Sequence, residues 1–193
     1  MKVVTLLGSP RANGNTATLA KAFNETAQEQ GADVKTYLLN TLNFKGCQAC
    51  EACKTKSDKC VLADDLTEVL DAVAETDILV LASPVYFADT TAQLKAFVDR
   101  CYSYMAPFET MPEISRLAPG KMMVFITAQN APDEMFFDVA GKYISIFKHL
   151  GFSGSRLIRG CDLMAADDLQ TKNRQDLIES AKQTAKEVVA PNR

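Results

Sequence analysis

The strongest constraint on the fold of this chain is the alternation of short apolar runs with longer helical stretches. This order is typical of a parallel sheet covered by helices on both faces. We expect strands at 2–7, 34–38, 78–82, 122–127 and 154–160, and helices at 16–30, 65–74, 91–102, 136–150 and 171–189. The sequence therefore predicts an α/β fold, with one doubly wound five-stranded parallel sheet in a single domain spanning 1–193.

Composition and charge restrict the partners and the cellular location that we expect for this chain. The formal net charge is −3 and the pI is about 5.3, so the chain lacks the basic stripe that neutralises nucleic-acid phosphates. No apolar run approaches the length of a membrane span, and the apolar start at 2–7 is too short for a signal peptide. We expect a cytoplasmic protein with no nucleic-acid or membrane partner.

Ligands of doubly wound sheets bind at the carboxyl ends of the strands. The loop after the first expected strand opens the first helix, where free N–H groups meet the positive end of the helix dipole. Ser9, Asn15 and Thr16 add hydrogen-bond donors, and Arg11 adds a bidentate cation. The loop carries neither a P-loop nor a dinucleotide fingerprint, so it predicts a cradle for a phosphate monoester; an ordinary turn is the alternative.

Two further loops follow the third and fourth expected strands. Ser83, Pro84, Val85, Tyr86 and Phe87 combine a stiff backbone with two aromatic side chains, which suits a planar heterocycle. By itself this pattern is weak, and core packing of Tyr86 and Phe87 would be the default interpretation. The polar side chains of the other loop belong to Thr127, Gln129 and Asn130. We expect their segment to meet the polar edge of the same ring.

Four cysteines form the run Cys47-x2-Cys50-x2-Cys53-x6-Cys60, within an insertion at 46–61 after the second expected strand. Dense local thiolates suit an iron–sulfur cluster, whereas structural zinc more often takes two separated pairs. Redox-active thiols are a further alternative, and nothing indicates the oxidising compartment that disulfides need. We expect the four cysteines to be metal ligands, with zinc left open.

Taken together, the phosphate cradle, the ring site and the sheet describe a flavodoxin-like FMN fold. The chain resembles the iron–sulfur flavoprotein branch of the NADPH-dependent FMN reductase family, over at least residues 1–130. The motifs that carry this resemblance are Gly8-Ser9-Pro10-Arg11, Gly14-Asn15-Thr16, Ser83-Pro84-Val85-Tyr86-Phe87, Lys95 to Arg100 and the cysteine run.

The resemblance implies FMN and a [4Fe–4S] cluster, the latter on the four cysteines of the run, in a homodimer or homotetramer. It implies FMN contacts from Ser9, Pro10, Arg11, Asn13, Gly14, Asn15, Thr16, Ser83, Pro84, Val85, Tyr86, Phe87, Thr127, Gln129 and Asn130. No side chain is expected to act as a general acid or base, because flavin chemistry belongs to the cofactor. His149 is expected to be structural, and Cys101 and Cys161 are expected to be ordinary buried thiols.

Three functions remain open. The first is an iron–sulfur flavoprotein that moves electrons between a ferredoxin-like one-electron donor and FMN or an acceptor. The second is an NAD(P)H-dependent flavin or quinone reductase without a cluster, and the third is a flavodoxin-type carrier without turnover. The charge of Lys45, Lys54, Lys56 and Lys59 would favour the reduced cluster and dock an acidic electron carrier; the alternative is that these lysines merely solubilise the loop. The apolar segment Tyr102–Met111 is expected to form the oligomer interface.

Overall fold

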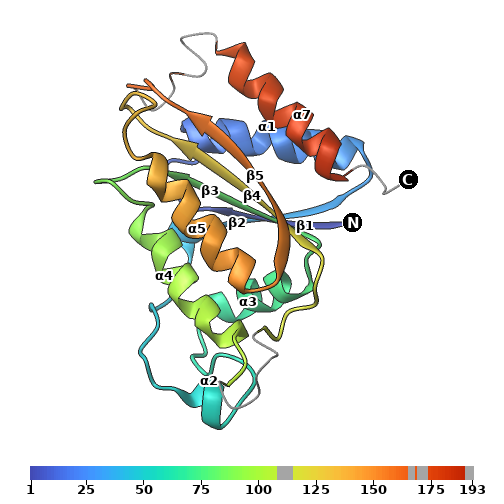
Figure 1. The fold of residues 1–193 in the computed structure, drawn as a ribbon, viewed down its shortest axis with the longest axis vertical. Coiled ribbons are helices and arrows are strands. Elements are labelled where there is room, and N and C mark those ends of the chain that lie inside the picture. The colour runs from blue at the N-terminus through green and yellow to red at the C-terminus, as the bar shows by residue number, and fades with distance from the viewer. Residues whose placement is uncertain (108–114, 165–167, 169–173, 190–193) are drawn as a thin grey trace.

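A computed structural model describes residues 1–107, 115–164, 168 and 174–189. Its centre is one sheet of five parallel strands in the order β2-β1-β3-β4-β5. The strands are β1 (Lys2–Leu7), β2 (Asp33–Leu38), β3 (Ile78–Pro84), β4 (Lys121–Ala128) and β5 (Phe152–Gly160). The expected doubly wound sheet is confirmed (Figure 1).

All five expected helices are present, with bounds shifted by a few residues. They are α1 (Asn15–Glu29), α3 (Leu66–Glu75), α4 (Ala92–Arg100), α5 (Phe137–His149) and α7 (Gln175–Val189). The helix expected at 91–102 ends at Arg100 and continues as the 3-10 turn η2 (Cys101–Tyr104). Residues 171–173 of the last expected helix lie outside the described part of the chain.

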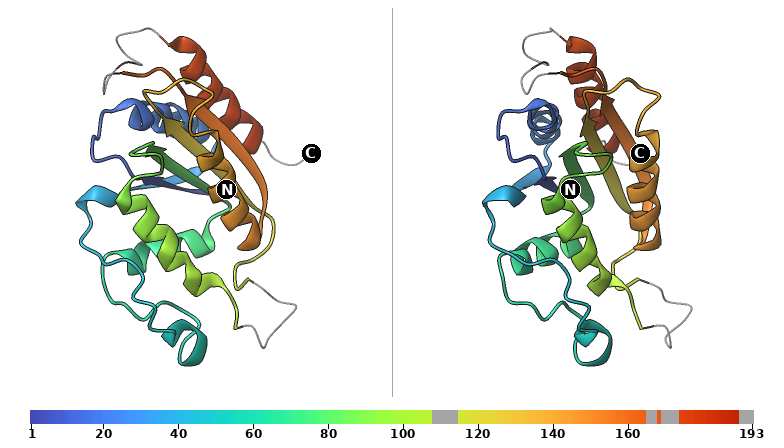
Figure 2. Two further views of the ribbon diagram at one scale, coloured as in Figure 1. Left: turned by 60° about the vertical axis from the view of Figure 1, so that its left-hand side comes forward. Right: turned by 90° about the vertical axis from the view of Figure 1, so that its left-hand side faces the viewer.

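The helices cover the two faces of the sheet as separate layers, which Figure 2 shows from two sides. Helices α1 and α7 pack on one face and α3, α4 and α5 on the other. Successive side chains of β3 point to opposite faces of the sheet and so contribute to both layers. Leu79 and Leu81 pack in the core under α3, α4 and α5, whereas Ile78 and Val80 pack in the core under α1 and α7. Each such fully buried side chain stabilises the fold by roughly 1.5–3 kcal/mol.

The prediction of strict strand–helix alternation is wrong between β2 and β3. This stretch holds η1 (Leu39–Thr41), the four-residue helix α2 (Ala52–Thr55) and then α3. Residues 46–61, named here the cysteine lobe, lie beyond the carboxyl end of α4, at the bottom of Figure 1. Short helices such as α2 have no apolar period that a sequence could reveal.

The segment expected to be exposed for oligomerisation is partly internal. Tyr104 is buried, and its hydroxyl donates a hydrogen bond to the carbonyl of Leu70 at 2.7 Å. This aromatic side chain therefore belongs to the chain's own core, and the expectation of an uncovered Tyr104 is wrong. Phe108 and Met111 lie outside the described residues. Among the helices that the structure describes, none is long and apolar enough to cross a membrane.

Candidate functional site

The loop after β1 is held at the point where strand order reverses between β1 and β3. Gly8 donates its N–H to Ala82 at 2.8 Å, and the hydroxyl of Thr91 donates to the carbonyl of Gly8 at 2.9 Å. A Cβ at position 8 would meet Thr91 Oγ1 at 2.8 Å and Leu94 Cβ at 3.0 Å. Only glycine allows the loop to pack this closely on the start of α4.

The same loop turns into α1 without a side-chain cap. Gly14 is the N-cap, and the first turn of α1 holds no acidic residue. Ser9 Oγ accepts the N–H of Arg11 at 3.1 Å and donates to its carbonyl at 3.2 Å, which fixes the turn, while the Arg11 side chain is exposed. A helix start beside a guanidinium suits an anion with several oxygens, such as a phosphate monoester.

A cleft of about 390 Å³ lies along the carboxyl ends of β1, β3 and β4, a size typical of small-ligand sites. Its lining comprises Ser9, Arg11, Gly14, Asn15, Thr16, Pro84, Val85, Tyr86, Phe87, Ala128, Gln129, Asn130, Leu163 and Met164. The structure thus brings together most of the residues expected from the three loops. The site residues expected from the sequence did not include Ala128, Leu163 and Met164. Leu163 and Met164 follow β5, an edge strand whose end carries no recognisable motif.

Four expected site residues do not line the cleft. Pro10 and Asn13 are exposed on the first loop. Thr127 is buried within β4, and Ser83 Oγ accepts the N–H of Thr91 at 3.0 Å. Ser83 and Thr127 therefore belong to the framework behind the cleft.

The tip of the second loop is a strained hairpin turn. Tyr86 and Asp89 exchange N–H···O bonds of 2.7 and 3.1 Å across Phe87 and Ala88, whose φ angles are +46° and +69°. A turn with two consecutive left-handed residues normally takes glycine or asparagine, so these two side chains store strain. The turn leaves Phe87 completely exposed at the cleft mouth.

Asp89 ties this turn to α5. Its carboxylate accepts hydrogen bonds from Lys142 Nζ at 2.6 Å and the Tyr143 hydroxyl at 2.8 Å. Burial alone would raise the pKa of Asp89, but the hydrogen bonds from Lys142, the Thr90 N–H and Tyr143 outweigh it and hold this pKa below its ordinary value. Burial raises the pKa of Tyr143, which therefore stays a neutral donor.

The third loop forms a wall of the cleft through Gln129. This side chain is buried, and its Nε2 donates to the carbonyls of Ala131, Pro132 and Met135. Its Oε1 accepts from Arg159, a framework residue that no sequence motif indicated. The amide of Gln129 is thus committed to the shape of the loop.

All four cysteines of the lobe line one small hollow, together with Arg100 and Tyr102. Each is a free thiol; Cys47 and Cys50 are exposed, Cys53 is buried and Cys60 is half-buried. The backbone winds through left-handed residues at Ala49 and Glu51, on either side of Cys50. The N–H of Ala49 donates to Cys47 Sγ at 3.5 Å.

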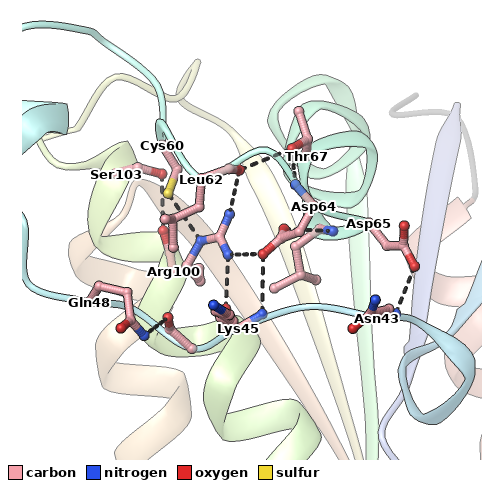
Figure 3. A network of polar contacts seen from close by, with 12 residues as sticks. Asn43, Lys45, Gln48, Cys60, Leu62, Asp64, Asp65, Thr67, Arg100 and Ser103 are labelled. Atoms are coloured by element: carbon pink, nitrogen blue, oxygen red, sulfur yellow. Dashed lines mark hydrogen bonds and ion pairs between the residues drawn. The ribbon is translucent and has the colours of Figure 1, made fainter.

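Arg100 fixes one side of the hollow (Figure 3). Its guanidinium has no exposed surface and donates from Nε to Cys60 Sγ at 3.0 Å and from Nη1 to Asp64 Oδ2 at 2.8 Å. Burial would raise the pKa of Asp64, but the bonds from Arg100 and from the N–H of Lys45 hold it below its ordinary value. Both charges are therefore present in the folded protein.

The lysines of the lobe have different roles. Lys54 Nζ donates to the carbonyls of Tyr102 and Met105, both at 2.6 Å, and lies 4.0 Å from the ring centroid of Tyr102. Burial lowers the pKa of Lys54. Lys59 pairs with Asp71 at 2.7 Å, whereas Lys45 and Lys56 have exposed side chains. Lys54 therefore does more than solubilise the loop, because it anchors the lobe to the backbone of Tyr102 and Met105.

Three residues that were expected to lie outside the binding sites, Cys101, Cys161 and His149, have different surroundings. Cys101 is buried in the core, as expected, but Cys161 is only half-buried, with Sγ 3.6 Å from Asp133 Oδ1. His149 is exposed at the last position of α5. None of the three lines the cleft or the cysteine hollow.

The cysteine hollow and the cleft offer different groups to a ligand: thiols in the hollow, and backbone, polar and aromatic groups in the cleft. Within the described residues, no three His, Cys, Asp or Glu side chains are grouped closely enough to hold a single metal ion. A four-iron cluster holds its thiolates further apart than one ion does, and four thiols around one hollow with N–H···S donors fit it. The cleft fits a phosphate joined to a flat ring.

Comparison with known proteins agrees with these features. Residues 1–131 match the family described as NADPH-dependent FMN reductase. An iron–sulfur flavoprotein of Archaeoglobus fulgidus is 33% identical over 151 residues, covering 78% of this chain and 64% of the relative. One of Methanocaldococcus jannaschii is 38% identical over 100 residues, covering 52% of this chain and 51% of the relative. The matches thus span about half to two thirds of these relatives.

Solved structures of low sequence identity share the fold. An NAD(P)H:quinone oxidoreductase from Methanothermobacter marburgensis superposes with a TM-score of 0.77 at 17% identity, over 100% of this chain and 99% of the other. An FMN-dependent NADH-azoreductase from Bacillus anthracis, solved with FMN, gives 0.76 at 16% identity, over 98% and 100%. The expected flavodoxin-like fold is confirmed.

The cleft at the strand ends and the family match together define the class of this protein. The chain belongs to the NADPH-dependent FMN reductase family. Within that family its similarity to several iron–sulfur flavoproteins assigns it to the iron–sulfur flavoprotein branch, as the sequence motifs predict.

Proposed function

We propose that this chain is an iron–sulfur flavoprotein that transfers electrons between a one-electron donor and FMN or an acceptor. FMN lies in the cleft, with its phosphate on the Ser9–Thr16 turn and its ring between the second and third loops. The exposed guanidinium of Arg11 and the uncapped start of α1 support the phosphate position. The exposed aromatics Tyr86 and Phe87 support the ring position.

The observation that carries the proposal is the hollow shared by Cys47, Cys50, Cys53 and Cys60. These four thiolates hold one [4Fe–4S] cluster. When bound, such a cluster exchanges one electron at a time, whereas FMN exchanges one or two. The two sites together therefore connect one-electron and two-electron partners.

The protein's own part is to orient and separate the two groups. Helix α4 starts after Thr91, which is bonded to Gly8 and Ser83, and it ends at Arg100, which is bonded to Cys60. Nine helical residues span roughly 14 Å at about 1.5 Å per residue. One rigid helix thus fixes the position of the cysteine lobe relative to the cleft.

The exposed charges beside the cysteine lobe support a soluble protein as the electron donor. The exposed Lys45 and Lys56 offer positive charge beside the lobe to an acidic, ferredoxin-like donor, with NAD(P)H as the alternative donor. We also propose a cytoplasmic homodimer or homotetramer in which residues 1–193 act as one FMN-binding domain.

A second candidate is an NAD(P)H-dependent flavin or quinone reductase without a cluster. The observation that favours it is the apolar cleft mouth, where Tyr86, Phe87 and Met164 are all exposed. Such a surface suits a flat, apolar electron acceptor.

Anaerobic purification followed by iron, sulfide and flavin assays tests the proposal. We expect one FMN, four iron and four sulfide per chain, with broad absorbance beneath the flavin bands. Flavin without iron, together with rapid reduction by NADPH in stopped flow, would favour the second candidate. Stoichiometric zinc after expression with ample iron would contradict the cluster.

A further inference from the structure

The side chain of Arg100 stands apart from the other basic groups of the lobe by its burial and its partners. Its guanidinium is fully buried at the carboxyl end of α4. Besides Cys60 Sγ and Asp64 it donates to the carbonyls of Lys45 at 2.9 Å and Leu62 at 3.1 Å. The two segments that lead into and out of the cysteine lobe are thus joined by one side chain, as Figure 3 shows.

A second arginine, Arg116, contacts other parts of the lobe. Arg116 Nη1 donates to the carbonyls of Cys53, Asp58 and Ser103 at 2.8–3.0 Å. It therefore ties the lobe to the body of the protein through backbone atoms, whereas Arg100 also reaches a sulfur. Both arginines anchor the lobe, but their electrostatic effects on a group bound there differ.

We propose that Arg100 is a positioning residue that holds Cys60 as a ligand and raises the reduction potential of the cluster, an inference that rests on the proposed function. Reduction adds negative charge, part of which resides on the ligand sulfurs. An N–H···S bond from a buried cation stabilises that added charge, because the surrounding dielectric constant is low. Outer hydrogen bonds of this kind both orient metal ligands and tune the bound group.

Asp64 sets the geometry of the guanidinium rather than cancelling its effect. Its Oδ2 accepts from Arg100 Nη1 and from the N–H of Lys45 at 3.1 Å, while its Oδ1 accepts from Leu66 at 3.1 Å. The carboxylate lies on the Nη1 edge and leaves the Nε edge to Cys60. Lysine could replace the charge of Arg100 but not this fork of donors.

The first experiment is a redox titration of the anaerobically prepared holoprotein, followed by electron paramagnetic resonance. Arg100→Lys and Arg100→Met are compared with Arg116→Lys. We expect Arg100→Met to shift the reduction equilibrium about tenfold towards the oxidised cluster, which is about 59 mV more negative for one electron. Arg100→Lys keeps the charge but loses the fork of donors, so its shift should have the same sign and be smaller. Arg116→Lys should leave the potential unchanged. Equal potentials in the Arg100 variants and the wild type would overturn the tuning role.

The second experiment measures positioning without the cluster, by hydrogen–deuterium exchange of the wild type, Arg100→Met and the matched variant Arg116→Met. Arg100→Met should accelerate exchange at least fivefold in peptides covering 44–46 and 60–64, and Arg116→Met in peptides covering 52–58. Unchanged exchange at 44–46 and 60–64 would overturn the positioning role. A wild type that never binds iron would refute the proposed function and the tuning role, while this measurement still decides positioning.

Discussion

Two arginines show how burial decides the role of a side chain. Arg11 is exposed on the turn after β1 and is available to a ligand, whereas Arg100 is buried and its donors are used within the protein. The sequence alone gives both the same charge. Their surroundings make one a candidate binding group and the other a framework group.

Replacing Arg11 by alanine should weaken FMN binding. Loss of one charge-assisted hydrogen bond to the phosphate corresponds to a dissociation constant about ten- to a hundredfold higher. Fluorescence titration with FMN measures this, and Arg156→Ala, on β5, is the control. Riboflavin binding should hardly respond to Arg11→Ala. If riboflavin binds the wild type as tightly as FMN does, the phosphate site is wrongly assigned.

Asp89 should contribute to the pH dependence of stability. Its folded pKa lies below the ordinary value of 3.8, so its contribution is present above that pH and is lost as the pH falls through the folded pKa. Asp89→Asn should lower the free energy of unfolding at pH 7 by at most about 1 kcal/mol, since the ion pair with Lys142 is partly exposed. Urea unfolding at pH 7 and pH 3 measures this, and the difference between variant and wild type should shrink at pH 3.

At the scale of elements, the hairpin turn between β3 and α4 combines strain with exposure. Phe87 and Ala88 are both left-handed, and Asp89 ties the turn to Lys142 and Tyr143 of α5. Strained backbone of this kind persists only where neighbouring elements hold it in place. Its position at the cleft mouth links the strain to the proposed ring site.

Ala88→Gly should stabilise the protein. Glycine removes the left-handed strain at φ +69° but adds entropy to the unfolded chain, so the net gain is about 0.5–1 kcal/mol. The same substitution at Ala72, inside α3, should instead destabilise by about 1 kcal/mol. Thermal unfolding of both variants measures the two signs. A lower melting temperature for Ala88→Gly would show that the turn is not strained.

At the scale of the whole molecule, two candidate sites lie at opposite ends of α4. The cleft uses the carboxyl ends of three strands, and the cysteine lobe lies beyond the end of the helix (Figures 1 and 2). Because different elements build the two sites, each can be removed without unfolding the other.

Cys→Ala at any of Cys47, Cys50, Cys53 or Cys60 should lose or degrade the cluster and leave the flavin bound. Iron and flavin assays on anaerobically prepared variants measure both. Cys101→Ala and Cys161→Ala serve as controls, since neither thiol lines the hollow. Full iron content in one of the four ligand variants would remove that cysteine from the ligand set.

The protein should also self-associate. Phe87, Phe137 and Met164 are more than two-thirds exposed, at 106%, 71% and 72%, and a monomer rarely leaves so many large apolar side chains uncovered. Sedimentation at micromolar concentration should show a dimer or tetramer. A monomer there would count against the proposed oligomer.

The sequence by itself determined the sheet, its five helices and the three loops that form the cleft. Periodicity and strand-end position express local physics, so Ser9, Arg11 and Tyr86 could be found without coordinates. The cysteine spacing likewise indicated one shared site. Only the tertiary structure decided the partners of these residues. Arg100 and Cys60 are forty residues apart, and Leu163 and Gln129 follow different strands, so their contacts depend on how distant segments pack.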